Sequence, residues 1–184
     1  MSGHNKWAQI KHKKAATDAK RGKNFSKLLS AITIAAKSGD PNPDFNPRLR
    51  TAIKTAHDAQ MPADNIERAI KRASDTSVQV EEALMEAYGP GGTALLIEAV
   101  TDNTNRTVPE VKKILNDHGG KWAETGSVLW AFEQNMTTRE WHAKFPIELP
   151  DDDAEPLSAL IEALEEHPDV QQVTTNVAEE EQLQ

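Results

Sequence analysis

The spacing of apolar residues changes near residue 78, and this change constrains the fold more than any single motif does. Before it, apolar residues recur every three or four positions, which is typical of amphipathic helices. After it, short apolar runs alternate with glycines and prolines, which is typical of strands mixed with helices. The charge changes at nearly the same place: residues 1–75 hold 15 Lys/Arg against 7 Asp/Glu, and residues 76–184 hold 6 against 22. Together the two breaks predict two small domains, 1–75 and 76–184.

The first domain is predicted to be a three-helix bundle that follows a basic arm at residues 1–24. The helices are expected at about 26–37, 47–59 and 62–73. Ser26 is the expected N-cap of the first helix, because a side-chain oxygen at that position can accept a bond from a free backbone N–H. Asn46 is the expected N-cap of the second, with Pro47 at the first helical position, where its missing N–H costs nothing.

The second domain is predicted to be α+β. Strands are expected at 80–88, 93–100, 127–132, 145–149 and 170–175, and helices at 107–117 and 155–166; residues 89–92 (GPGG) are expected to form a hairpin turn. From residue 93 onward the order is βαββαβ. That is the order of a ferredoxin-like sandwich, with the 80–88 strand as an extra N-terminal strand and a frayed acidic tail at about 178–184.

The basic arm is the leading candidate for a nucleic-acid contact. It combines cations that can neutralise phosphates with one aromatic ring that can stack on a base. The candidate residues are Lys6, Trp7, Lys11, His12, Lys13, Lys14, Lys20, Arg21 and Lys23. The alternative is a solvated basic tail in which Trp7 packs onto the helical bundle.

Four arginines extend this positive surface onto the second and third helices: Arg48, Arg50, Arg68 and Arg72. Arg68 and Arg72 are four residues apart, so they share one helix face and can follow a phosphate backbone. The alternative is an exposed face whose charges pair with neighbouring acids.

The polar stretch 101–107 lies between a predicted strand and a predicted helix. Asn103, Asn105 and Arg106 are candidates to receive a phosphate or an acidic partner at the start of that helix. Simple capping by Asn105 or Thr107 is the alternative explanation.

The sequence offers little support for an enzyme or a metalloprotein. It has no cysteine, its six histidines are scattered, and it lacks the phosphate-binding and nucleophile-elbow motifs. The run 151–153 (DDD) has no second acidic cluster and is expected to be solvated. We therefore expect no cofactor, no metal, no membrane segment and a cytoplasmic location.

Several segments, in order, resemble a known family: GHNKWAQIKHKKAATDAKRGKNFSKL, NPRLRTAI, MPADNIERAIKRA, YGPGGTALLIEAVTDNTNRT and GSVLWAF. They are similar to the YebC family, also called PmpR-like transcriptional regulators, which is related to mitochondrial translational activators of cytochrome oxidase. The resemblance covers about residues 2–133 and resumes more weakly at about 157–176. Between Phe132 and Phe145 the chain is about a dozen residues long, where the family carries an inserted third domain.

The resemblance implies a non-enzymatic, cytoplasmic, DNA-binding transcriptional regulator. The alternative is a ribosome-associated translation factor that binds ribosomal or transfer RNA. A third hypothesis is a protein-interaction module whose acidic second domain binds a basic partner. Since DNA and RNA carry the same phosphates, charge alone does not choose between them.

Overall fold

The computed structural model describes residues 6–11, 25–75, 77 and 79–178. The three helices α2 (Phe25–Ser38), α3 (Pro47–Asp58) and α4 (Ala63–Ala73) form a helical unit. Apolar residues from all three helices form one core, which contains Ile32, Ala35, Leu49, Ala56, Ile66 and Ala69. The three predicted helices are confirmed. Ser26, however, lies inside α2 and is not its N-cap.

Asn46 fixes the corner between α2 and α3. Its Oδ1 accepts a hydrogen bond from the backbone N–H of Leu49, as expected of an N-cap ahead of Pro47. Its Nδ2 donates to the carbonyl oxygens of Ala35 and Asp40, each at 2.8 Å. One buried side chain therefore starts α3 and satisfies carbonyls at the end of α2.

The second group is an antiparallel sheet in the order β3-β1-β2-β6. Its strands are β1 (Glu81–Tyr88), β2 (Ala94–Thr101), β3 (Lys121–Ala123) and β6 (Val170–Thr175). The short 3-10 helix η1 (Pro90–Gly92) closes the β1–β2 hairpin, with Gly91 at φ +70, where a side chain would be strained. The hairpin predicted at 89–92 is confirmed.

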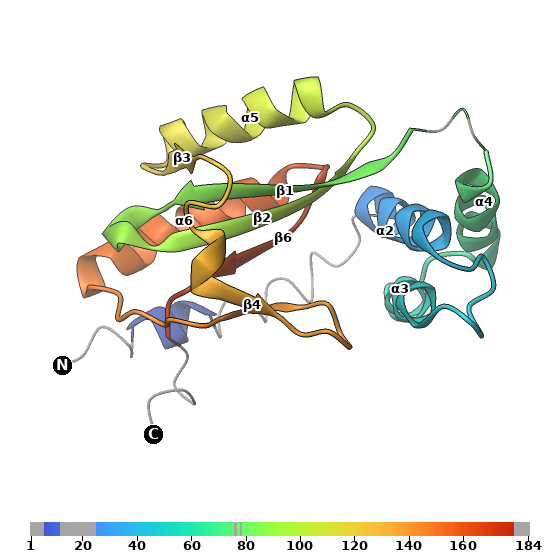
Figure 1. Ribbon diagram of the computed structural model, residues 1–184, viewed down its shortest axis with the longest axis horizontal. Helices are drawn as coiled ribbons and strands as arrows, with labels where there is room; N and C mark the ends of the chain where they lie inside the picture. The colour runs from blue at the N-terminus through green and yellow to red at the C-terminus, as the bar shows by residue number, and fades with distance from the viewer. Residues whose placement is uncertain (1–5, 12–24, 76, 78, 179–184) are drawn as a thin grey trace.

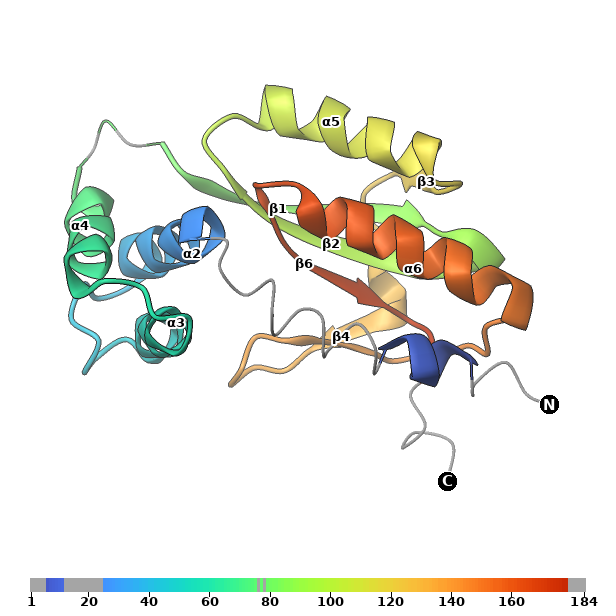
Figure 2. The same ribbon diagram turned by 180° about the vertical axis from the view of Figure 1, so that it is seen from behind.

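Two helices cover one face of this sheet, α5 (Thr104–Asp117) and α6 (Asp151–Glu166) (Figures 1 and 2). The core between them and the sheet includes Ile97, Val111, Leu115, Leu157, Leu160 and Leu164. The α+β class is confirmed. The predicted βαββαβ order is wrong in detail: β1, expected as an extra strand, lies inside the sheet, so its elements run ββαβαβ.

One end of the opposite face is covered by η2 (Leu129–Ala131) and the hairpin of β4 (Phe132–Gln134) and β5 (Trp141–Ala143). α2 of the helical unit also contacts β2 and β6. The strand predicted at 127–132 is wrong because a buried carboxylate takes up the backbone N–H groups that a strand would use. Glu86 on β1 accepts from Gly126, Val128 (2.8 Å) and Leu129 (2.9 Å). The strand predicted at 145–149 is reduced to one bridge, between Ile147 and Val177.

The start of the basic arm is folded against the sheet rather than against the helical unit. Residues 6–11 are helical, and Trp7, only 6% exposed, belongs to the core beneath α6 together with Leu149 and Leu157. Trp7 is therefore not available to stack on a base, and the alternative of packing on the helical bundle is also wrong. No helix in the described part of the chain is long and apolar enough to cross a membrane.

Candidate nucleic-acid interface

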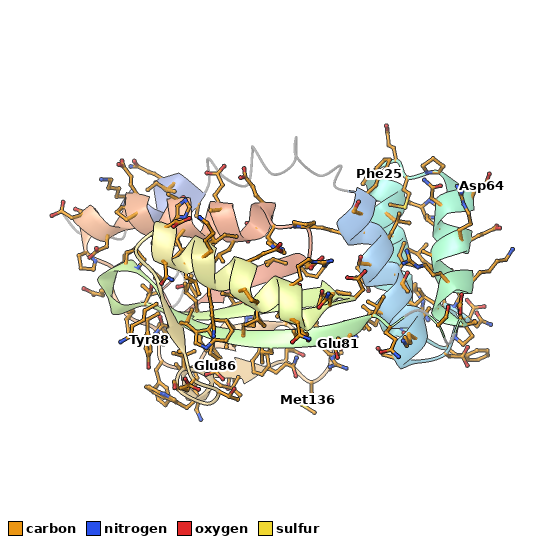
Figure 3. All side chains as sticks on the ribbon, turned by 90° about the horizontal axis from the view of Figure 1, so that it is seen from above. Phe25, Asp64, Glu81, Glu86, Tyr88 and Met136 are labelled. Atoms are coloured by element: carbon orange, nitrogen blue, oxygen red, sulfur yellow. The ribbon has the colours of Figure 1, made fainter. Side chains whose placement is uncertain are left out.

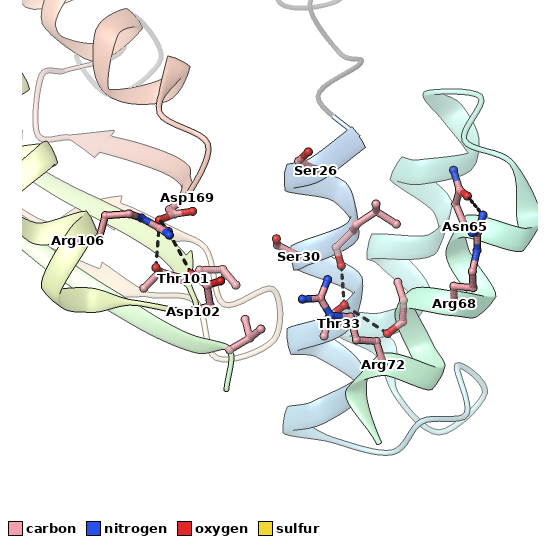
Figure 4. A pocket seen from close by; sticks show the side chains of 14 residues that line it. Ser26, Ser30, Thr33, Asn65, Arg68, Arg72, Thr101, Asp102, Arg106 and Asp169 are labelled. Carbon is pink, nitrogen blue, oxygen red and sulfur yellow. Dashed lines mark hydrogen bonds and ion pairs between the residues drawn. The ribbon is translucent and has the colours of Figure 1, made fainter. Parts of the chain in front are cut away.

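A cleft of about 460 Å³ lies between the helical unit and the end of the sheet where β2 stops and α5 begins. We call it the arginine cleft, because Arg68, Arg72 and Arg106 line it (Figure 4). Hydroxyl groups of Ser26, Ser30 and Thr33 and the amide of Asn65 add polar lining on the helical side. Asp102 and Asp169 lie on the sheet side.

The wall formed by α4 carries the two arginines because this helix is strongly amphipathic. Ile66 and Ala69 are buried, which leaves Arg68 and Arg72 exposed one turn apart. Arg68 donates from Nε to the carbonyl oxygen of Asp64 (3.1 Å) and from Nη2 to the side chain of Asn65. The Arg72 guanidinium lies within electrostatic reach of Asp75, whose pKa is lowered by hydrogen bonds from Ser77 and, after them, by the charge of Arg72. No side-chain hydrogen bond joins Arg72 to another residue in the described part of the chain, so its guanidinium donors there are open to a ligand.

The wall formed by α2 is less polar. The hydroxyl of Thr33 donates to the carbonyl oxygen of Leu29 at 2.9 Å and is already used inside the helix. Ser26 and Ser30, four residues apart, lie on the same face and line the cleft. This serine pair was not among the predicted site residues, although its spacing on an otherwise apolar helix is the signal that marks it.

The sheet wall is an ion-paired network. Arg106 lies 2.6 Å from Asp169 and 3.1 Å from Asp102. The hydrogen bond with Asp169 raises the pKa of Arg106. Burial raises the pKa of Asp169, but hydrogen bonds from Thr107, Arg106 and Thr101 outweigh that effect, and the net pKa is lowered. Both partners are thus charged at neutral pH, and an anion that approached Arg106 would compete with two carboxylates.

Asn103 proves to be the N-cap of α5. Its side chain accepts from the backbone N–H of Arg106 at 3.2 Å, and the helix starts three residues before the predicted position. Capping by Asn105 or Thr107 is therefore wrong; Asn105 is exposed, and Thr107 is buried against Asp169. Because the cap already uses one of the free N–H groups, the start of α5 is a weaker anion site than the sequence suggested.

The remaining predicted basic residues are spread over the molecule. Lys6 lies 3.5 Å from Glu155, and Arg48 pairs with Glu82. Arg50 donates to the carbonyl oxygens of Pro43 (3.2 Å) and Asp44 (2.9 Å), which braces the α2–α3 loop. Lys11 lies at the end of the first helical segment. His12, Lys13, Lys14, Lys20, Arg21 and Lys23 lie outside the described residues.

The described helical unit is only slightly basic. Residues 25–75 hold 8 Lys/Arg against 6 Asp/Glu, so most of the positive charge of the first 75 residues precedes α2. Within the described ranges, no group of three His, Asp or Glu side chains is arranged to hold a metal ion.

Two family models match the chain in succession. The TACO1/YebC protein N-terminal domain matches residues 5–76, and the TACO1/YebC second and third domain matches residues 80–139. The chain belongs to the TACO1/YebC family. The resemblance seen in the sequence is therefore confirmed.

Relatives of this TACO1/YebC chain share a printed name. A protein of Desulfosudis oleivorans named "Probable transcriptional regulatory protein" is 56% identical over 136 residues, which is 73% of this chain and 55% of the relative. A protein of Dictyoglomus turgidum with the same name is 55% identical over 136 residues, with the same coverage. This chain spans about half the length of the curated relatives it matches.

The TACO1/YebC fold is also seen in a solved structure. The crystal structure of a conserved hypothetical protein, Aq1575, from Aquifex aeolicus superposes with a TM-score of 0.80 at 36% sequence identity. The match covers 97% of this chain and 99% of that one. The arrangement of helical unit and sheet is thus that of the family.

Proposed function

We propose that this chain is a non-enzymatic transcriptional regulator that binds DNA through the arginine cleft. The α4 wall carries this proposal, because Arg68 and Arg72 project from one helix face and both line the cleft. Guanidinium groups in such a row bind successive phosphates with little sequence preference. The names of the curated relatives support the regulatory role.

The positive charges that precede α2 in the sequence also support DNA binding. α2 begins at Phe25, directly after a sequence that holds Lys13, Lys14, Lys20, Arg21 and Lys23. We assign residues 1–75 as the DNA-binding domain on this basis. Residues 76–184, with a net charge of −16, repel phosphate and restrict the duplex to the face formed by α4 and the cleft.

A promoter-binding experiment tests this function. The full chain is mixed with labelled promoter fragments and with shuffled duplexes of the same length, and complexes are separated on native gels at increasing salt. A regulator is expected to bind certain promoters better than their shuffled versions, with affinity that falls steeply with salt. Equal binding to every duplex would contradict specific regulation, and no binding to any duplex would contradict DNA binding itself.

A further inference from the structure

Three exposed aromatic rings lie at the end of the sheet away from the helical unit. Tyr88 ends β1, Trp130 lies in η2, and Phe145 follows β5. Their side chains are 39%, 63% and 50% exposed, respectively. Figure 3 shows Tyr88 at the end of β1 remote from the three helices, whereas Glu81, at the start of the strand, lies nearer to them. We call Tyr88, Trp130 and Phe145 the aromatic patch.

Short contacts join the three rings into one surface. The carbonyl oxygen of Ser127 accepts a hydrogen bond from Nε1 of Trp130 (2.8 Å) and another from the hydroxyl of Tyr88 (3.3 Å). The ring centroids of Trp130 and Phe145 lie 5.6 Å apart. The indole donor is therefore satisfied, and the rings are held in place before a partner arrives. Rings that are already ordered lose little conformational entropy on binding.

The chemistry of the patch fits a protein surface. Large exposed side chains scattered singly need no partner, but contiguous ones mark interaction sites. Trp and Tyr are enriched among the hot spots of protein–protein interfaces. Nucleic acid is disfavoured here, because the surrounding domain, residues 76–184, holds 6 Lys/Arg against 22 Asp/Glu and repels phosphate.

The charges beside the patch are of both signs. Nζ of Lys144 lies 5.5 Å from the centroid of the Phe145 ring. Glu133 lies directly opposite His142 across the β4–β5 hairpin, and Lys144 is two residues after His142, so these side chains share the outer face of the hairpin. Lys144 and Glu133 are exposed, and neither forms an ion pair with another residue in the described part of the chain. A surface with one open charge of each sign is complementary to a second copy of itself.

We propose that two copies of this chain associate through the aromatic patch in a two-fold symmetric dimer. Trp130 and Phe145 of one copy pack against the same rings of the other copy. Lys144 of each copy meets Glu133 of the other. Because a two-fold contact uses the same surface on both copies, each of these contacts is made twice.

The position of the patch leaves the arginine cleft open. The first residue of β2, Ala94, pairs with Tyr88 in the patch, and the last residue, Thr101, lines the arginine cleft. A strand of eight residues separates the two sites by about 23 Å. The dimer therefore carries two accessible arginine clefts, and the proposal does not depend on what those clefts bind.

Light scattering of the full chain, eluted from a sizing column at increasing concentration, tests the proposal. The wild type is expected to approach twice the mass of one chain. Trp130→Ser removes the most exposed ring of the patch and should weaken the dimer at least about tenfold. The control Met136→Ser removes a side chain that is 91% exposed at the turn between β4 and β5, outside the patch, and should leave association unchanged.

An exchange of charges distinguishes a contact between copies from a contact within one copy. Lys144→Glu and Glu133→Lys, each alone, should weaken association, because like charges then face each other across the two-fold axis. An equimolar mixture of the two variants should dimerise again, since each variant meets the opposite charge on the other. A residue that acts only on the fold of its own chain is not rescued by mixing.

A chain that stays monomeric at every concentration would overturn the inference, and the patch would then be left to a protein of different sequence. Association that Trp130→Ser and both charge variants leave unchanged would overturn it as well, because the copies would then meet elsewhere. Charge variants that dissociate alone but do not associate when mixed would contradict the two-fold arrangement. None of these results bears on DNA binding, which is measured separately through Arg68 and Arg72.

Discussion

The guanidinium of Arg106 lies 2.6 Å from Oδ2 of Asp169, and this ion pair joins the start of α5 to the turn before β6. The same oxygen lies 3.0 Å from the hydroxyl of Thr101 and 2.6 Å from that of Thr107. One carboxylate therefore holds three segments together. Because Asp169 is only 15% exposed, the network fixes the sheet wall of the arginine cleft.

Asp169→Asn is expected to change the pH dependence of stability. The folded-state pKa of Asp169 is lowered, so the carboxylate stabilises the fold above its unfolded pKa, and that contribution is lost as pH falls through the folded pKa. The variant should lose about 1–3 kcal/mol at neutral pH and lose less than the wild type on acidification. Urea unfolding at a series of pH values measures both effects. Parallel curves for the two proteins would contradict the role of this carboxylate.

Glu86→Gln is expected to loosen the loop that carries η2. Burial raises the pKa of Glu86, but the backbone N–H groups of Gly126, Val128 and Leu129 outweigh it and lower the net pKa. The amide loses the charge and part of the acceptor capacity, which should cost about 1–3 kcal/mol. Hydrogen exchange should speed up at those three amides. Unchanged exchange there would mean that other contacts hold the loop.

The contacts of Glu86 show why one part of the fold could not be predicted from the sequence. Asn46–Pro47 and the glycines at 89–92 act on neighbours a few residues away, so the helix start and the hairpin were predicted correctly. The segment 127–132 has the apolar content of a strand, but its N–H groups bind a carboxylate about 40 residues earlier in the chain. No local pattern records such a partner.

Part of the candidate site could also be predicted from the sequence, and part of it could not. Arg68 and Arg72 were found from helical spacing, which requires only that α4 exist. The position of Trp7 was missed because its core partners Leu149 and Leu157 lie about 140 residues away. The arginine cleft arises where the helical unit meets the sheet, and neither segment alone carries a sequence pattern that predicts how the two pack together.

Trp7→Ala should act on stability rather than directly on a nucleic-acid contact. The indole is 6% exposed in the core of the sheet, so its removal should cost about 3–5 kcal/mol. Chemical unfolding followed by circular dichroism measures this cost. Full stability together with weaker nucleic-acid binding would instead restore the stacking role predicted from sequence.

Glu98→Gln is expected to stabilise the protein at neutral pH. Because burial, and after it the charge of Glu82, raise the folded pKa of Glu98, the ionised form destabilises the fold above that pKa. The penalty disappears as pH falls through the raised pKa, so the variant should melt above the wild type at neutral pH and close to it near about pH 4. Thermal melting at the two pH values measures the difference. A lower melting temperature for the variant at neutral pH would contradict the account.

The arginine cleft is proposed to bind the phosphates of DNA. Its most direct test is fluorescence anisotropy of a labelled duplex with the full chain at several salt concentrations, for the wild type, Arg68→Gln/Arg72→Gln and the control Lys113→Gln/Lys121→Gln. The control removes two exposed charges that do not line the cleft. The arginine variant should bind about tenfold more weakly or worse, and its slope of log K against log salt should fall by about 1.8, as expected for two lost phosphate contacts. Equal affinity and equal slope for the arginine variant and the control would contradict the claim.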